Sequence, residues 1–209
     1  IDFIIECAEK YRDEKITICA LGPLTNIARV LTKNPGVTGS IEEIVLMGGG
    51  FFEGGNITPA AEFNIYVDPE AAKIVLDSGV KITMLPLDVT HKTLVQRDFL
   101  EKLRKSGKNS AREAAKLLDF FERYDVEKYG SQGGPLHDPN VIVYLLNPEI
   151  YEGKLVNVEI EVNSELTRGM TVVDWWNVTN RKPNAYYIND VKDDKFFEVV
   201  LNKVLSLEI

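Results

Sequence analysis

Residues 41–50 read IEEIVLMGGG, an apolar run that leads directly into three consecutive glycines. Short runs of β-branched residues bounded by turns are typical of strands buried within a sheet. Two other runs have the same character, KITICAL at residues 15–21 and KITMLPL at residues 81–87. Between these runs, helical patterns occupy residues 23 to about 32 and residues 68–76. The chain therefore alternates strand and helix through this section.

This alternation predicts an α/β fold, with an open, mostly parallel, mixed sheet flanked by helices in a Rossmann-like arrangement. A more helical section follows at residues 97–129, and we expect a final amphipathic helix near residues 193–205. No internal repeat or low-complexity linker is visible, so we expect residues 1–209 to form a single domain. Ligands of such sheets bind outside the carboxyl ends of the strands, which places LGPLTN, MGGGFFEGGN and LDVTHK along one edge.

The composition is that of an ordinary globular protein, with 44% hydrophobic and 27% charged residues. The net charge of -8 repels a phosphate backbone and argues against a nucleic-acid polymer as a partner. No apolar run reaches the length of about 18 residues that suits a membrane span, and no secretory leader is visible. We therefore expect a cytoplasmic protein with no membrane partner.

The glycine-rich segment after residues 41–47 is the first candidate site. Its glycines do not form a G-x-G-x-x-G fingerprint, and no Lys-Ser/Thr pair follows them, so a nucleotide-phosphate site and a dehydrogenase are unsupported. Asn56, Glu62 and Asn64 come next. Two amides and a carboxylate offer the donors and acceptors that vicinal sugar hydroxyls require. A polar loop that satisfies its own backbone through Asx-type turns explains these residues equally well.

Asp68 and Asp138 are each followed by proline, which places an aspartate at a helix N-cap and proline at the first helical position. Capping is a sufficient account of both aspartates. Asp138 differs because His137 precedes it after a glycine-rich break. A carboxylate beside an imidazole on a loop is also able to bind a metal or to handle protons. Capping remains the simpler interpretation of Asp138 when the pair is taken alone.

Taken together, these segments resemble the inosine-uridine preferring nucleoside hydrolases. The resemblance is carried by ALGPLTNIA at residues 20–28, VLMGGGFFEGGNITPAAEFNIYVDPEAA at residues 45–72, LDVTHK at residues 87–92, HDP at residues 137–139 and RGMTVVDWW at residues 168–176. It covers the chain from about Ile1 to its end, and its long central motif is far more specific than any single glycine pattern.

The resemblance implies the nucleoside-hydrolase type of α/β fold and an enzyme of nucleoside catabolism and salvage. Members of this family cleave the N-glycosidic bond of ribonucleosides to free base and ribose, by way of an oxocarbenium-like transition state. They hold one calcium ion, which binds the attacking water. The resemblance also implies a ribonucleoside as the substrate and a homodimer or homotetramer as the assembly.

Asp138 and the backbone carbonyl of Leu21 are implied by the resemblance to be calcium ligands. His137 falls where many members place a residue that assists the departing base. Tyr129 lies where the base pocket is usually lined, and Asp125, one helical turn earlier, is implied to join it. A histidine and a tyrosine at these places suit purines and pyrimidines equally, so the base preference stays open.

The resemblance further implies that Asn56, Glu62 and Asn64 hold the ribose hydroxyls, with Met47 packing near the sugar. This role gives the glycine-rich segment a physical purpose. Positive charge develops on the ribose ring in the transition state, so the ring must be gripped and surrounded by negative or dipolar groups. Glycines allow the backbone to close over a small polyol.

One part of the family pattern is missing, because the opening D-x-D-x-G-x-D-D, which supplies most calcium carboxylates and the general base, does not occur in this sequence. One carboxylate and one carbonyl are too few for a calcium site, since calcium takes about 6–8 oxygen ligands. We therefore expect a polypeptide of these 209 residues alone to be inactive and to bind calcium weakly or not at all.

Two interpretations of this departure stay open. The chain is part of a full-length hydrolase that lacks its amino-terminal segment here, or it is a short paralogue that binds a ribosyl ligand or a protein without catalysis. We favour the first, because a sequence freed from catalysis has no need of the whole set of site residues. A transporter component is an alternative of another class, and the lack of a leader weighs against it.

Overall fold

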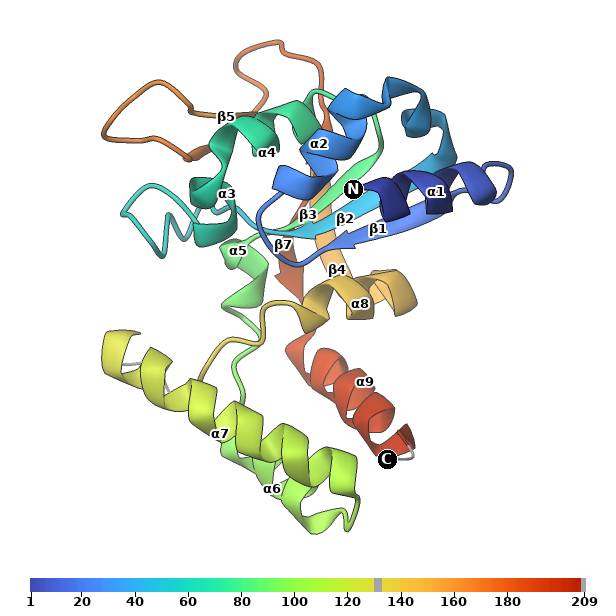
Figure 1. The fold of residues 1–209 in the computed structure, drawn as a ribbon. Coiled ribbons are helices and arrows are strands. Elements are labelled where there is room, and N and C mark those ends of the chain that lie inside the picture. Colours follow the sequence, from blue (N-terminus) through green and yellow to red (C-terminus); the bar gives the residue numbers. More distant parts are fainter. Residues whose placement is uncertain (130–132, 208–209) are drawn as a thin grey trace. The chain divides into compact units, whose positions relative to one another are not determined.

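The computed structural model of the chain describes residues 1–129 and 133–207, and it describes only the backbone of residues 121–129. Figure 1 shows how the described elements are connected. In chain order they are α1 (Asp2–Lys10), β1 (Ile16–Ala20), α2 (Thr25–Lys33), the 3-10 helix η1 (Pro35–Ser40), β2 (Ile41–Met47), α3 (Phe63–Val67), α4 (Pro69–Leu76), β3 (Ile82–Leu85), α5 (Leu87–Thr90), α6 (Arg97–Lys105), α7 (Asn109–Tyr129), α8 (Pro139–Leu146), the 3-10 helix η2 (Pro148–Ile150), β4 (Tyr151–Val156), β5 (Val158–Ile160), β6 (Thr171–Val173), β7 (Ala185–Val191) and α9 (Asp193–Ser206).

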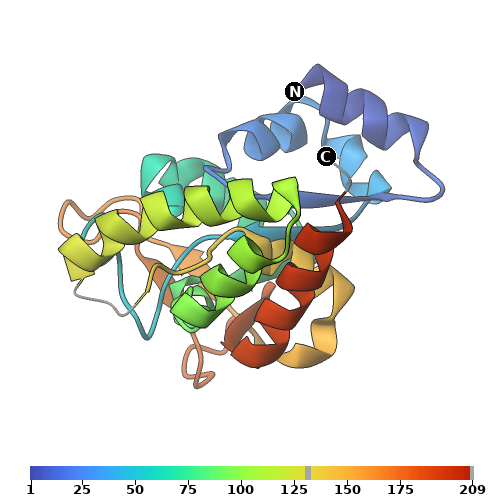
Figure 2. The ribbon, with the colours of Figure 1, turned by 90° about the horizontal axis from the view of Figure 1, so that it is seen from below.

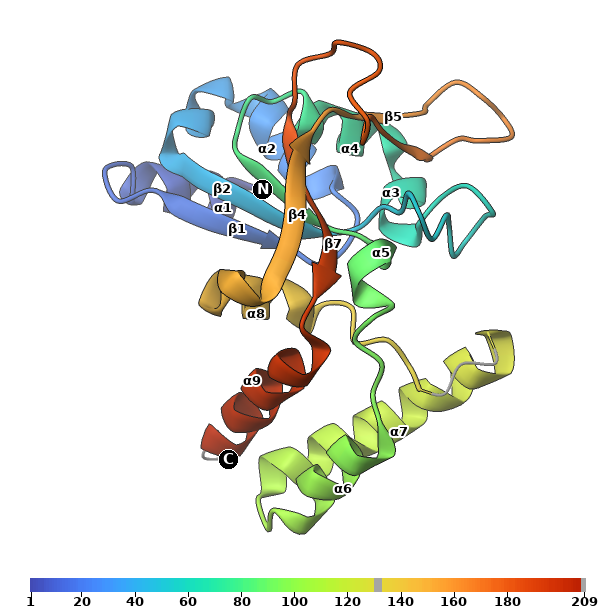
Figure 3. The ribbon, with the colours of Figure 1, turned by 180° about the vertical axis from the view of Figure 1, so that it is seen from behind.

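The described strands form a five-stranded sheet in the order β1-β2-β3-β7-β4 and a separate pair, β5-β6. The pairs β1-β2, β2-β3 and β3-β7 are parallel, and β5 runs antiparallel to β6. From behind, Figure 3 shows β4 and β7 side by side after β3, although long stretches of chain separate the three strands in the sequence. The predicted α/β fold with a mostly parallel, mixed sheet flanked by helices is confirmed.

The central strands β2 and β3 are covered on both faces, whereas β1 at the edge of the sheet is only partly buried. All but one residue of β2 and every residue of β3 are buried, as a continuous apolar run predicts. Side chains that alternate along a strand point to opposite faces. On one face, α2 and α4 supply apolar residues to a common core, which contains Ile27, Val30, Leu31, Ile44, Leu46, Ala71, Ala72, Val75, Ile82 and Met84.

Most ends of the predicted strands and helices lie one or two residues from the observed ends. The run at residues 81–87 gives a strand of only Ile82–Leu85, because Pro86 cannot continue the ladder and Leu87 opens α5. The helix predicted from residue 68 begins at Pro69, and Asp68 is its N-cap.

The chain divides into two compact units. The first unit contains Ile1–Asp88 and Glu152–Asn189, and the second contains Val89–Tyr151 and Asp190–Ile209. The single domain expected from the sequence stays a prediction. The first unit contains β1, β2 and β3 with the helices that cover them.

The second unit is helical, as the section at residues 97–129 predicts. In Figure 2, α6, α7 and α9 lie side by side, and their contacts form one apolar core. Its members include Phe99, Leu100, Leu103, Ala111, Ala115, Phe197, Val200, Leu201 and Val204. None of the described helices is long and apolar enough to cross a membrane.

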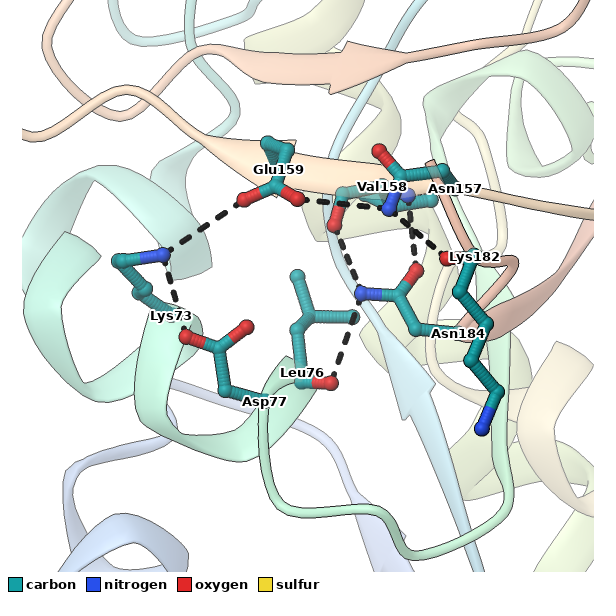
Figure 4. Close-up of polar contacts among 8 residues, drawn as sticks. All are labelled: Lys73, Leu76, Asp77, Asn157, Val158, Glu159, Lys182 and Asn184. Atoms are coloured by element: carbon teal, nitrogen blue, oxygen red, sulfur yellow. Dashed lines mark hydrogen bonds and ion pairs between the residues drawn. The ribbon is translucent and has the colours of Figure 1, made fainter. Parts of the chain in front are cut away.

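Within the first unit, the side chain of Asn184 attaches β5 to α4 (Figure 4). Its Oδ1 accepts the Val158 N–H at 2.8 Å, and its Nδ2 donates to the Val158 carbonyl at 2.9 Å. The same Nδ2 lies 3.5 Å from the Leu76 carbonyl at the end of α4. Because Val158 is fully buried, Asn184 replaces the strand partner that this residue lacks on one side.

We expect the Asn184→Ala variant to lower the free energy of unfolding by about 1–3 kcal/mol, because it leaves the buried N–H and carbonyl of Val158 unpaired. Urea denaturation measures this loss. Lys182→Ala is the matched control, since that side chain is exposed and only its backbone carbonyl accepts a bond from Asn157. A change within about 0.5 kcal/mol is expected for the control. Equal midpoints for the two variants would contradict the role of Asn184.

Candidate functional site

The carboxylate of Glu62 organises the chain where the glycine-rich loop enters α3. Glu62 is 2% exposed and stands at the N-cap of α3. Its Oε1 accepts the Asn64 N–H at 2.9 Å, and its Oε2 accepts the Gly49 N–H at 3.0 Å and the Ile65 N–H at 3.3 Å. The carboxylate therefore joins the loop after β2 to the first turn of α3, where a negative charge is favoured.

Asn64 lies beside Glu62 and is fixed by the end of β2. Its Nδ2 donates to the Met47 carbonyl at 3.1 Å and lies 3.4 Å from the Met47 Sδ. Both residues are buried. Because the Asn64 Nδ2 already donates to Met47, the orientation of the amide is set. The Asn64 Oδ1 is then the side-chain atom that is able to accept a hydrogen bond from a ligand.

Asn56 approaches the same turn of helix from the loop. Its Oδ1 accepts the Phe63 N–H at 2.9 Å, at the first residue of α3. Leu21 follows β1 directly, and the last residue of β1, Ala20, pairs with Leu46. Leu21 therefore leaves the sheet at the same edge as Met47. The structure thus gathers Met47, Asn56, Glu62 and Asn64 around the start of α3 and brings Leu21 to the same edge of the sheet.

Asp88 is a buried residue that sequence reasoning missed. It is 3% exposed and accepts three consecutive backbone N–H groups, those of Phe51, Phe52 and Glu53, at 2.9, 2.5 and 2.9 Å. The Tyr187 hydroxyl donates to the same carboxylate at 2.6 Å. The available signal was a charged residue directly after the apolar run at residues 81–87, because a carboxylate buried there requires several donors.

The loop is also closed tightly by its own backbone. A Cβ on Gly50 would lie 2.1 Å from the Gly54 carbonyl oxygen, which is far inside van der Waals contact. The segment therefore needs glycine at residue 50, because no other residue fits so close an approach of two backbones.

In the second unit, His137 is largely buried beside α5. Its Nδ1 lies 2.7 Å from the Thr90 Oγ1, and its ring centroid is 5.7 Å from that of His91. Burial, helped by the nearby His91, lowers the pKa of His137 to about 4. The imidazole is therefore neutral at neutral pH and carries one N–H donor and one acceptor.

The predicted position of Asp138 at the N-cap of α8, before Pro139, is confirmed, but the capping role predicted for its side chain was wrong. Its backbone is helical, with φ -64° and ψ -38°, and its side chain accepts no capping bond. A capping residue needs an extended backbone to reach the first amides of the helix. Partial burial raises the pKa of the Asp138 carboxyl. Asp68 does cap as predicted, since its Oδ1 accepts the Ala71 N–H at 3.0 Å.

Asn140 is a second residue that sequence reasoning missed, and it fixes the turn that carries His137 and Asp138. It is fully buried, and its Nδ2 donates to the Thr93 Oγ1 at 2.9 Å and to the Leu136 carbonyl at 2.6 Å. The Tyr151 hydroxyl donates to its Oδ1 at 3.0 Å.

The remaining predicted site residues, Asp125 and Tyr129, lie on α7, and their side chains are outside the described part of the chain. In the part that is described, no three acidic, histidine or cysteine side chains gather into a group that could hold a metal ion. Asp138 therefore belongs to no such group of three among the described residues.

We expect His137 to titrate near pH 4 in a nuclear magnetic resonance titration of the imidazole protons, with His91→Gln used to assign the two histidines. Its pKa of about 4 in the fold lies below the ordinary value of 6.5, so the fold favours the neutral ring. This contribution to stability is complete above about pH 6.5 and is lost as the pH falls towards 4. His137→Gln should remove this part of the pH dependence. A midpoint near 6.5 would contradict the buried environment.

Comparison with known proteins places this geometry in a family. The sequence profile described as inosine-uridine preferring nucleoside hydrolase matches residues 1–198. An uncharacterized protein of Schizosaccharomyces pombe is 48% identical over 204 residues, which are 98% of this chain and 66% of that protein. The pyrimidine-specific ribonucleoside hydrolase RihA of Enterobacter sp. is 43% identical over 198 residues, 94% of this chain and 63% of its own length.

A solved structure gives the same result. The purine-preferring ribonucleoside hydrolase from Gardnerella vaginalis superposes with a TM-score of 0.88 at 30% identity, covering 98% of this chain and 64% of that one. The chain spans about two thirds of the length of the proteins it matches. Since the family profile covers nearly the whole chain and the fold agrees, the chain belongs to the inosine-uridine preferring nucleoside hydrolase family.

Proposed function

We propose that the protein hydrolyses the N-glycosidic bond of ribonucleosides and releases free base and ribose. Membership of the family supports this reaction. The observation that carries the proposal is the fixed amide of Asn64. Its nitrogen is bound to the Met47 carbonyl, so its Oδ1 is turned to accept a hydrogen bond, and a ribose hydroxyl supplies the matching donor.

Asn56 and Glu62 complete the proposed ribose site. Glu62 places a buried negative charge at the start of α3, beside the Asn64 amide. Positive charge develops on the sugar ring as the glycosidic bond breaks, and a preorganised carboxylate stabilises that charge more strongly than water does. Asn56 is held at the first residue of α3 and contributes a second amide to the same region.

His137 is proposed to assist the departing base. With a pKa of about 4, its ring holds no extra proton at neutral pH. The neutral imidazole therefore acts as a hydrogen-bond donor to the leaving base through its single N–H rather than as a cationic acid. Asp125 and Tyr129 stay the proposed lining of the base pocket.

Calcium is the cofactor that the family implies, but the described residues do not fit a calcium site by themselves. They offer one carboxylate, that of Asp138, and one backbone carbonyl, that of Leu21, which belong to different units. Calcium takes about 6–8 oxygen ligands, so this pair is insufficient. Asp138 and Leu21 remain proposed ligands only in company with other groups.

A protein that binds a ribosyl ligand without cleaving it is the second candidate, because the amides of Asn56 and Asn64 and the carboxylate of Glu62 suit the binding of sugar hydroxyls whether or not cleavage follows. Nucleoside binding without turnover would identify this case. The base is open in both cases, since one relative is called pyrimidine-specific and one solved structure purine-preferring.

The proposed reaction is tested by incubating the naturally produced protein with uridine or inosine and measuring the reducing sugar that is released. Asn64→Ala should lower kcat/KM about 100-fold, because removing one preorganised group costs about this factor in other hydrolytic sites. Asn163→Ala, at an exposed asparagine in the loop after β5, is the matched control and should leave kcat/KM unchanged. Turnover that survives Asn64→Ala intact would contradict the proposed site.

A calorimetric titration of the 209-residue chain with calcium chloride should show no binding tighter than about 10⁻⁵ M, because the described ligands are too few. Asp138→Asn should leave the weak heats unchanged. Saturable, tight binding that Asp138→Asn abolishes would show that the chain builds a calcium site after all.

A further inference from the structure

The loop at residues 48–56 connects β2 to the proposed ribose site, and several of its backbone N–H groups donate to one carboxylate. The N–H groups of Phe51, Phe52 and Glu53 all donate to Asp88. Three consecutive amides that converge on one acceptor fix the direction of every peptide plane between them. Leu87, the residue before Asp88, also holds the loop, because its N–H donates to the Gly49 carbonyl at 2.9 Å.

Asp88 has little capacity left for a ligand. Its Oδ1 accepts from two backbone amides, and its Oδ2 accepts from one amide and from the Tyr187 hydroxyl. A carboxylate accepts about four hydrogen bonds, so its oxygens are saturated by the protein itself. Asp88 therefore acts on the loop and does not contact a substrate.

Tyr187 fixes Asp88 from the sheet. Tyr187 is fully buried on β7, where its neighbour in the parallel register is Met84 of β3. Burial, together with the negative charge of Asp88, raises the pKa of its hydroxyl well above the ordinary value. The hydroxyl therefore stays protonated and remains a donor to the carboxylate.

Aromatic side chains hold the same segment from its other side. The ring of Phe52 lies 4.7 Å from that of Phe51 and 5.5 Å from that of Trp175, and the ring of Trp175 lies 6.4 Å from that of Tyr187. All three pairs meet edge to face, which is a favourable geometry for aromatic rings. Phe52, whose N–H donates to Asp88, thus packs on Trp175, and Trp175 packs on the tyrosine that donates to the same carboxylate.

We propose that Asp88 is the positioning residue of the ribose site, held in turn by Tyr187. By fixing residues 51–53 it places Asn56 on one side and the Gly49 amide, which binds Glu62, on the other. This inference rests on the proposed function, because it assigns Asp88 to that same site. An amide in place of the carboxylate would turn an NH₂ group towards backbone donors and release the loop.

The first test is amide hydrogen exchange in the 209-residue chain, read by mass spectrometry on peptides. Asp88→Asn should speed exchange in the peptide that spans residues 48–56 and leave residues 161–167 unchanged. Glu161→Gln is the matched control, because Glu161 also accepts two loop amides, those of Asn163 and Ser164. It should produce the opposite pattern. Unchanged exchange at residues 48–56 in Asp88→Asn overturns the proposal.

The second test is nucleoside hydrolysis by the naturally produced protein. Asp88→Asn should lower kcat about 100-fold, which is the effect of a displacement of about 1 Å in a reacting geometry. Tyr187→Phe keeps the fold and the carboxylate and should give a smaller loss, whereas Glu161→Gln should leave kcat unchanged. If Asp88→Asn does not fold, Tyr187→Phe decides both tests by the same criteria.

The two tests separate the two hypotheses. Faster exchange with an unchanged kcat would show that Asp88 fixes the loop without positioning the site, which overturns the proposal while the proposed function stands. A wild-type protein without nucleoside hydrolysis would overturn the proposed function and the site role of Asp88 together, whereas the exchange result would still establish Asp88 as the anchor of the loop.

Discussion

Two buried carboxylates meet the hydrogen-bonding needs of the loop that follows β2, and the arrangement of the first unit's candidate site depends on them. A buried charge is unfavourable unless several donors surround it, and a buried loop backbone is unfavourable unless its N–H groups find acceptors. Asp88 and Glu62 satisfy both requirements at once, because together they accept six backbone amides between residues 49 and 65. The loop backbone is thereby held by hydrogen bonds although it forms no strand.

The fold was predictable from the sequence because its signals are local. The continuous apolar run of β2 and the alternation of strands with α2 and α4 predicted the α/β fold. Each of these patterns is recognised within a stretch of about ten residues. The capping of α4 by Asp68 was predictable for the same reason. Where the local signal was ambiguous, prediction failed. Asp138 precedes proline as Asp68 does, yet its backbone is helical, and nothing in the tripeptide separates the two.

The parts of the site that the sequence did not reveal depend on distant partners. Asp88 has an evident role only when Tyr187, from the other end of the chain, is beside it. Asn140 fixes its turn through partners that include Thr93, far away in the sequence, and Tyr151 on β4. Asn56, Glu62 and Asn64 could be named from their motif, but the sharing of Glu62 among three backbone amides could not, because hydrogen-bond geometry is set by the folded chain.

Gly49 shows how the sheet and the site constrain one residue. Its φ of +84° is costly for other residues, and a Cβ at this position would also lie 2.8 Å from the buried Thr171 Oγ1. The turn that these limits enforce aims the Gly49 N–H at Glu62, while the preceding Met47 carbonyl holds Asn64. Met47 is the last residue of a strand that has a neighbouring strand on both sides. The Met47 carbonyl is therefore held in place by the sheet, and it holds the Asn64 amide in turn. The orientation of the Asn64 amide is therefore set by β2 as much as by the asparagine itself.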